Sequence, residues 1–363
     1  MPAPLPKANP RGRDPGELGA RLSEWLGSLI DGGPPAVSIE PTSDATGISS
    51  ETILFDMAPT DGRPSERLVA RMEPDDPVPV FPSYDMELQF RCLEVVQEHT
   101  SVPVPRPRWY EPDESVLGAP FFVMDRVEGR VPPDLPPYTF EGWLRDATPA
   151  DQARLWMSSI DVLAGIHTLN PRDHDLSFLE RGGTGDDDID KYLDRERAYF
   201  QWAADVERYP TIAAAFEWLV ENRPASPGPS VMNWGDARIG NIMFRDFEPV
   251  GVFDWELAAL GPREADVGWS LFLHTFFMEV AEMLDIDPGI EFPDRDETIA
   301  YYEKTTGVTL RDMEWYEAFA GYRFAAIITR TDARTIASGE SEAPDDPEST
   351  IHPLPLLRRI TGI

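Results

Sequence analysis

Cysteine, lysine and long apolar segments are all scarce in this chain of 363 residues. A single cysteine, Cys92, excludes an intramolecular disulfide and is typical of proteins of the reducing cytosol. A helix that spans a bilayer needs roughly 18 consecutive apolar residues, but the best candidate, residues 318–329, is shorter and contains Arg323. The first residues, MPAPLPKANPRGRD, lack the apolar core of a signal peptide. We therefore expect a cytoplasmic protein without a membrane segment.

Only three lysines, Lys7, Lys191 and Lys304, accompany 65 acidic residues, and the net charge is -33. Such a charge repels nucleic-acid phosphates, so we expect no nucleic-acid partner. It could steer a cationic substrate toward the protein, but a generally acidic, well-solvated surface is the simpler interpretation. With 41% apolar residues the chain can bury a sizeable core, either as two domains or as one two-lobed unit.

The first third of the chain favours an antiparallel sheet with one inserted helix, after a polar, proline-rich tail over residues 1–15. Apolar residues recur at helical spacing in two segments and form short strand-like runs in the others. The expected helices cover residues 15–30 and 84–98, and the expected strands cover residues 36–40, 52–56, 67–71, 108–110 and 121–125.

From residue 148 onward the apolar spacing is mainly helical, which makes the whole chain an α+β protein. One strand-like island interrupts the helices, a hairpin with strands at 241–244 and 250–254. The acidic segment 338–350 is expected to be a mobile loop. The expected helices cover residues 150–169, 187–206, 211–222, 264–284, 295–305 and 312–334.

The hairpin carries the most informative motif, which begins at Trp234 and runs WGDARIGNIMF. Asp236 lies five residues before Asn241, and Asp254 follows the second strand of the hairpin. Phosphoryl transfer by the kinase mechanism uses an Asp that takes the acceptor proton, then an Asn and a second Asp that bind Mg²⁺. Mg²⁺ prefers such oxygen ligands and completes its shell with water and phosphate oxygens. Two unrelated acidic loops are the alternative, but the ordered strand, turn and following Asp favour a functional site.

Together with GVFDWELAALGPREADVGW downstream, the motif resembles the aminoglycoside phosphotransferase/choline kinase-like family, whose pattern is HGD-x-x-x-x-N and then a strand ending in [IVF]-D-[WF]-E. It looks closest to the branch that includes the kinase-like domains attached to some acyl-CoA dehydrogenases. The resemblance spans roughly residues 36–340 and implies a bilobal protein-kinase-like fold with ATP between the lobes. We expect an N-terminal nucleotide-binding lobe over residues 1–125 and a helical C-terminal lobe over residues 126–363.

The resemblance implies one role for each matching residue of the motif. Asp236 matches the catalytic Asp, and Asn241 and Asp254 match the Mg²⁺ ligands. Glu256 is expected to assist the metal through water. Asp266 matches the residue that braces this region in the family, so we expect a structural role for it.

A kinase-type N-terminal lobe also needs a cation on its third strand, paired with a Glu on the inserted helix. None of the three lysines lies in the region of this strand, so Arg71 is the candidate cation for the ATP phosphates. Glu87 is its expected partner and Glu94 the competing one, whereas a simple surface ion pair is the alternative interpretation.

The resemblance also places the rest of the nucleotide site. The strand that ends at Asp125 resembles the family hinge, so the backbone of Asp125, Arg126 and Val127 is expected to bind adenine. The segment that ends in Ser49 and Ser50 lies where a phosphate-covering loop belongs, although its single glycine does not match G-x-G-x-x-G.

Two residues depart from the family pattern, since Trp234 replaces the usual His and Arg71 the more familiar Lys. We expect ATP- and Mg²⁺-dependent transfer of the γ-phosphoryl group to a hydroxyl of a small molecule. Two alternatives stay open: a nucleotide-binding regulatory protein or pseudo-kinase with little or no turnover, and an acidic hydrolase that uses Asp236 and Glu256. An aminoglycoside and a hydroxylated acyl compound are both conceivable acceptors. Candidate acceptor contacts from the late helices are Tyr301, Tyr302, Trp315, Tyr316, Tyr322 and Arg323.

Other features of the sequence have simpler explanations. His167 lies on an amphipathic segment and is expected to be structural, and Cys92 is expected to be packed in a core. The glycines of residues 182–185 precede three aspartates that would repel phosphate, so they indicate a flexible loop. The histidines and the cysteine show no zinc-ligand spacing.

Overall fold

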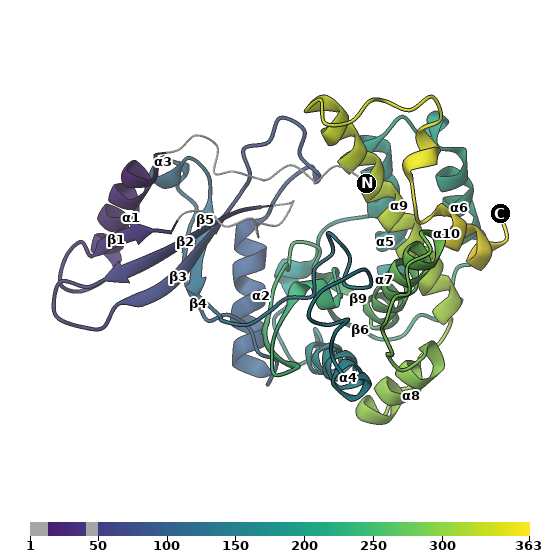
Figure 1. Cartoon of the computed structure of the whole chain (residues 1–363), viewed down its shortest axis with the longest axis horizontal. Coiled ribbons are helices and arrows are strands. Elements are labelled where there is room, and N and C mark those ends of the chain that lie inside the picture. Colours follow the sequence, from purple (N-terminus) through teal and green to yellow (C-terminus); the bar gives the residue numbers. More distant parts are fainter. Residues whose placement is uncertain (1–13, 41–49) are drawn as a thin grey trace.

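The chain forms a sheet-containing lobe and a larger helical lobe in the computed structural model, which describes residues 14–40 and 50–363 (Figure 1). The sheet has the strand order β1-β2-β3-β5-β4, and all of its neighbouring strands are antiparallel. This confirms the α+β, bilobal protein-kinase-like fold. The strands are β1 (Ala36–Ile39), β2 (Glu51–Ala58), β3 (Glu66–Met72), β4 (Pro107–Glu111) and β5 (Phe121–Asp125).

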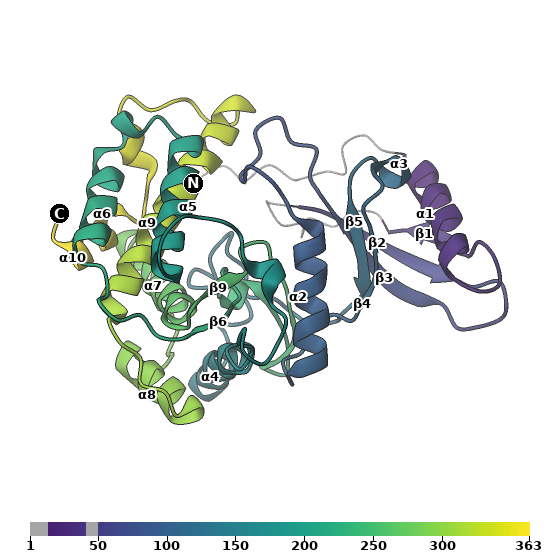
Figure 2. The same ribbon diagram turned by 180° about the vertical axis from the view of Figure 1, so that it is seen from behind.

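Two helices cover the opposite faces of this sheet, α1 (Pro15–Leu29) on the outside and α2 (Met86–His99) toward the second lobe (Figures 1 and 2). Side chains alternate between the faces along each strand. Leu68, Ala70 and Met72 of β3 therefore share a core with α1, whereas Val69 shares one with α2. Arg71, two residues beyond Val69, points to the same side, toward the helical lobe.

The helical lobe is built around α9 (Met313–Ala337), much of which is buried. The expected helices of this lobe are confirmed, with ends that differ by a few residues. Two further short helices had no clear periodic signal, α3 (Glu114–Leu117) in the first lobe and α10 (Leu354–Thr361) near the C-terminus. The other helices are α4 (Pro149–Ile166), α5 (Asp188–Ala203), α6 (Pro210–Glu221), α7 (Glu264–Met283) and α8 (Arg295–Thr306). Within the described part of the chain, none of the helices is long and apolar enough to cross a membrane.

Two small antiparallel ribbons carry the loops of the sequence motif. The expected hairpin is confirmed as β7 (Ile242–Arg245) and β8 (Glu248–Val252). The second ribbon, β6 (Ser230–Asn233) with β9 (Ala259–Pro262), was not expected. Its strands are short and mostly buried, so they show none of the polar–apolar alternation that identifies a strand in sequence.

The acidic segment 338–350 is more ordered at its end than its composition predicted. A 3-10 turn forms at Pro347–Thr350. The carboxylate of Glu348 accepts hydrogen bonds from the backbone N–H and hydroxyl of Thr211, at 2.7 and 2.6 Å. The segment expected to be a mobile loop is therefore anchored at this end by Glu348.

The packing of α1 on the sheet predicts unequal effects of two leucine substitutions. Leu22 is fully buried against the sheet, whereas Leu29 is 45% exposed at the end of the same helix. Leu22→Ala should lower the free energy of unfolding by about 2–5 kcal/mol, because it leaves a cavity in a closed core. Leu29→Ala should change it by less than about 0.5 kcal/mol. Urea denaturation followed by circular dichroism measures both, and equal losses would contradict this packing.

Candidate active site

The motif residues lie on two adjoining loops, residues 234–241 between β6 and β7 and residues 253–258 between β8 and β9. Gly235 makes the close approach of the loops possible. Its φ of +90° is strained for other residues, and a Cβ at this position would lie 2.2 Å from the carbonyl oxygen of Leu257. The tight turn at Gly235 thus sets Asp236 beside the second loop.

A buried carboxylate, that of Asp266 near the start of α7, holds the 234–241 loop from behind. It accepts the backbone N–H of Trp234 at 2.6 Å and that of Gly235 at 2.9 Å. His167 contacts the same carboxylate through Nε2 at 3.1 Å and the hydroxyl of Tyr302 through Nδ1 at 2.7 Å. The structure confirms the bracing role of Asp266 and the structural role of His167.

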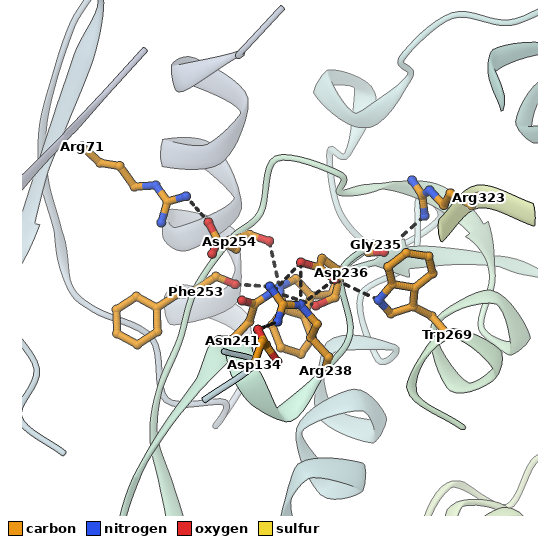
Figure 3. Close-up of polar contacts among 11 residues, drawn as sticks. Arg71, Asp134, Gly235, Asp236, Arg238, Asn241, Phe253, Asp254, Trp269 and Arg323 are labelled. Carbon is orange, nitrogen blue, oxygen red and sulfur yellow. Dashed lines mark hydrogen bonds and ion pairs between the residues drawn. The ribbon is translucent and has the colours of Figure 1, made fainter. Parts of the chain in front are cut away.

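Four hydrogen bonds orient the carboxylate of Asp236, as Figure 3 shows. Trp269 of α7 donates from Nε1 to Oδ1 at 2.9 Å, and Asn241 donates from Nδ2 to Oδ2 at 2.6 Å. Arg238 donates from Nε to both oxygens, at 3.1 and 3.0 Å. The side chain of Asp236 stays 14% exposed, so a small molecule can still reach it.

Arg238 connects Asp236 to a second carboxylate, that of Asp134, to which its Nη1 donates. Burial alone would lower the pKa of this guanidinium, but Asp134 and Asp236 raise it overall. Sequence analysis missed both Arg238 and Trp269. Arg238 lies inside the motif and could have been suspected there, whereas nothing distinguishes Trp269 from an ordinary core aromatic residue.

Trp234, in place of the family's usual His, joins the two loops. Its side chain is buried, and its Nε1 donates to the carbonyl oxygens of Phe253 at 2.8 Å and Asp254 at 3.1 Å. Its ring also packs near that of Trp255, with 5.9 Å between the centroids. The tryptophan therefore fixes the position of Asp254 relative to Asp236.

Asp254 adopts a left-handed backbone conformation, with φ of +57°, and its Oδ1 accepts a hydrogen bond from Nη2 of Arg71. Arg71 thus reaches from the first lobe into the motif loops (Figure 3). Burial lowers the pKa of this guanidinium, and the negative charge of Glu256 opposes the shift. Buried Arg71 therefore contacts Asp254 and is also influenced by the charge of Glu256.

The expected pairing of Arg71 with Glu87 is wrong in this structure. Glu87 and the competing Glu94 are both exposed on α2, and Arg71 pairs with Asp254 instead. The buried polar residue of this helix is Gln89, which is 1% exposed and whose Nε2 has no hydrogen-bond partner among the described residues. The spacing of polar residues along a helix does not show which of the three, Glu87, Gln89 or Glu94, faces the sheet.

The remaining predicted residues occupy varied surroundings. Glu256 is half-buried, and its backbone oxygen accepts from Arg181. In the predicted hinge, the N–H of Asp125 donates to the carbonyl oxygen of Arg106 at 2.9 Å. The N–H of Arg126 donates to the carbonyl oxygen of Arg67 at 3.0 Å, and Val127 follows it in the chain. Ser50 is buried before β2, whereas Ser49 lies outside the described residues.

Most of the candidate acceptor contacts are core residues instead. Tyr302, Trp315, Tyr316 and Tyr322 are at most 4% exposed, and Tyr301 is bonded to Asp161 at 3.0 Å, on α4. Arg323 alone of the six reaches a motif loop, since its Nη1 donates to the carbonyl oxygen of Gly235 at 3.2 Å.

No cluster of three or more His, Cys, Asp or Glu side chains suited to a metal ion occurs among residues 14–40 and 50–363. The oxygen donors at the site are the carboxylates of Asp254 and Glu256 and the amide of Asn241. Such a set is typical of a cation that takes its other ligands from phosphate and water.

The chain belongs to the phosphotransferase enzyme family, whose model matches residues 57–301. It is 28% identical to human acyl-CoA dehydrogenase family member 11 over 247 residues, 66% of this chain and 30% of the relative. Mouse acyl-CoA dehydrogenase family member 10 is 26% identical over 287 residues, 76% of this chain and 25% of the relative. The chain thus spans about a third or less of the length of these relatives.

Solved structures share the fold. A candidate aminoglycoside phosphotransferase from Ralstonia eutropha superposes with a TM-score of 0.66 at 20% identity, covering 94% of this chain and 96% of the other. The macrolide 2'-phosphotransferase MphH from Brachybacterium faecium gives a TM-score of 0.51 at 16% identity, covering 88% and 91%. At these identities the likeness establishes the fold and not the ligands.

The role of Asp266 predicts a large effect of its removal. Asp266→Ala leaves two backbone N–H groups and His167 without their acceptor, so the free energy of unfolding should fall by about 2–4 kcal/mol. Asp296→Ala, at an 89% exposed position of α8, should cost less than about 0.5 kcal/mol. Thermal unfolding of both variants beside the wild type tests this, and an unchanged midpoint for Asp266→Ala would refute the bracing role.

Proposed function

We propose that the protein is an ATP- and Mg²⁺-dependent phosphotransferase that moves the γ-phosphoryl group to a hydroxyl of a small molecule. One observation carries the proposal: Asp236, Asn241 and Asp254 converge on two adjoining loops, and Arg71 reaches them from the other lobe. This is the set of groups that kinase-type phosphoryl transfer requires, in the required order along the chain.

Asp236 would act as the catalytic acid/base that orients the acceptor hydroxyl and takes its proton. Its carboxylate is held by Trp269, Arg238 and Asn241 and remains partly accessible. A fixed, accessible carboxylate suits this task, because the proton moves only over hydrogen-bonding distance. Positioning is also the larger part of catalysis in phosphoryl transfer.

The donors present fit Mg²⁺. Asn241 uses its amide nitrogen on Asp236, so its Oδ1 is the atom that it can offer to a cation. The carboxylate of Asp254 would supply the second protein ligand, and Glu256 would act through water. When bound, the metal neutralises charge on the ATP phosphates.

Arg71 would hold the α- and β-phosphates. Its buried guanidinium is paired with Asp254. Phosphate oxygens are equivalent acceptors for arginine, so they can replace this carboxylate and leave Asp254 to the metal. The N–H of Val127 is the hinge group that would bind adenine, together with the carbonyls of Asp125 and Arg126. Ser49 and Ser50 remain predicted contributors to the nucleotide site, whereas Glu87 loses its predicted role because Arg71 pairs with Asp254. Residues 1–125 and 126–363 remain the proposed lobes.

The relatives support the class of reaction. The structure of aminoglycoside phosphotransferase APH(4)-Ia in a ternary complex with ADP and hygromycin B has the same fold, with a TM-score of 0.50 at 15% identity, covering 93% of this chain and 98% of that chain. ADP and a second molecule, hygromycin B, therefore bind together in that protein. By analogy, a small-molecule acceptor is the substrate class for this chain.

The proposal predicts that binding and turnover separate in two variants. Asp236→Asn keeps the shape of the side chain but removes the base, so ADP release with an active acceptor should fall by about 10²–10⁴-fold. Its affinity for ATP with Mg²⁺ should stay within about threefold of the wild type. Asp254→Asn should instead lose most of the Mg²⁺ dependence of ATP binding. Calorimetry with and without Mg²⁺, and a coupled ADP assay over a panel of hydroxyl compounds, measure these effects.

Asp246→Asn is a matched control, because Asp246 is exposed in the β7–β8 turn and Asn tolerates its positive φ. It should leave both binding and turnover unchanged. Equal ADP release by Asp236→Asn and the wild type would refute the role of Asp236. Absence of ATP binding by the wild type in the presence of Mg²⁺ would refute the proposed function itself.

A further inference from the structure

Three arginines form a connected group on the helical-lobe side of the motif loops: Arg181, Arg195 of α5 and Arg323 of α9. Arg195 donates from Nη1 to the carbonyl oxygen of Gly182 at 3.2 Å, next to Arg181 in the chain. Arg323 contacts Glu196, the residue after Arg195, with Nε 3.0 Å from Oε1. These contacts bring the three guanidinium groups together from distant parts of the sequence.

Both ends of this arginine cluster touch the candidate active site. Arg181 donates to the backbone oxygen of Glu256, and Arg323 donates to that of Gly235, the residue before Asp236. Arg323 also lies over the ring of Trp269, 5.5 Å from its centroid, and Trp269 bonds Asp236. In Figure 3, Arg323 and Arg71 lie on opposite sides of Asp236. Arg323 therefore lies on the side of Asp236 away from the cation proposed for ATP, and Arg181 reaches the second loop at Glu256.

The charges of the cluster are only partly balanced. Glu196 pairs with Arg323, but no ion pair joins Arg181 or Arg195 to a carboxylate of the described residues. Burial lowers the pKa of Arg181, and the like charges of Arg195 and Arg323 lower it further, whereas the negative charge of Asp85 opposes the shift. Burial also lowers the pKa of Arg195, against the opposing effects of Tyr192 and Glu196.

This arrangement is unusual in a chain with 65 acidic residues and 32 basic ones, where carboxylates are abundant. Bringing like charges together with few counter-charges is unfavourable unless something offsets it. Arg181 and Arg195 are half-buried, so a ligand can still reach them. Guanidinium groups bind carboxylate and phosphoryl oxygens in pairs of parallel hydrogen bonds.

We propose that Arg181, Arg195 and Arg323 form a subsite for an anionic group, a carboxylate or a phosphoryl group, of the acceptor. The assignment of this anion to the acceptor rests on the proposed phosphotransferase function. The anion subsite itself does not, because it follows from the arginines alone. A polycationic acceptor would be repelled here, so the subsite selects against the aminoglycoside class.

A binding experiment tests the subsite. The protein is first saturated with Mg²⁺ and a non-hydrolysable ATP analogue, so that the side of Arg71 is occupied. Inorganic phosphate and acetate are then titrated at constant ionic strength, with thermal stabilisation as the readout. Arg195→Gln should weaken binding of phosphate, of acetate or of both by about tenfold, as expected for one lost charge-assisted hydrogen bond. Arg195→Lys, which keeps the charge, should lose less.

Arg197→Gln is the matched control, because Arg197 lies two residues further along α5 and its side chain is 54% exposed. It should bind both anions like the wild type. A response to phosphate alone identifies a phosphoryl group, and a response to acetate identifies a carboxylate; either supports the subsite. Equal binding by Arg195→Gln and the wild type, no binding by the wild type, or equal weakening in Arg197→Gln would overturn it.

The same variants separate this proposal from the proposed function. Affinity for the ATP analogue should be unchanged in Arg195→Gln, which also shows that the variant is folded. If the wild type does not bind the analogue, the phosphotransferase proposal fails, and the anion titration is repeated in an Arg71→Gln background. With an active anionic acceptor, Arg195→Gln should raise KM about tenfold with little change in kcat. A fall in kcat at unchanged KM would contradict a binding role.

Discussion

The candidate site depends on one buried carboxylate, that of Asp266. It accepts two consecutive backbone N–H groups, those of Trp234 and Gly235, and is itself fixed by His167. A carboxylate that satisfies two adjacent N–H groups determines the direction of the chain there, since moving either group would leave a buried donor unpaired. The left-handed turn at Gly235 and the position of Asp236 follow from this anchor.

Arginines, and not lysines, pair with the carboxylates of the candidate site. Arg71 holds Asp254, and Arg238 holds Asp236 together with Asp134. Two carboxylates of the proposed chemistry, Asp236 and Asp254, are thus each paired with an arginine. A planar guanidinium can both neutralise and orient carboxylates, because it can contact two acceptors at once, whereas an ammonium group acts as a point charge. The near absence of lysine is therefore compatible with a complete site.

Sequence reasoning predicted the elements with strong periodicity and the motif order, and it failed where tertiary contacts decide. The helices of the C-terminal lobe and the hairpin at β7 and β8 were predicted because each repeats its pattern over many residues or follows a recognisable turn. The ribbon of β6 and β9 was missed because four-residue buried strands have no pattern. The predicted partner of Arg71 was wrong because α2 contains several polar residues. Only the packing of the helix shows that Glu87 is exposed and Gln89 is buried.

The net charge of the protein favours a cationic acceptor, whereas the arginines near Asp236 favour an anionic one. At physiological salt, charges separated by more than roughly 8 Å in solvent are largely screened, so the overall charge of -33 affects encounter more than recognition. Recognition depends on groups within hydrogen-bonding reach, and at the helical-lobe side of Asp236 these include arginines. An acidic surface and an anion-binding subsite are therefore compatible. The surface composition keeps the protein well solvated, whereas in the proposed subsite a few half-buried guanidinium groups would select the small molecule that approaches the proposed base.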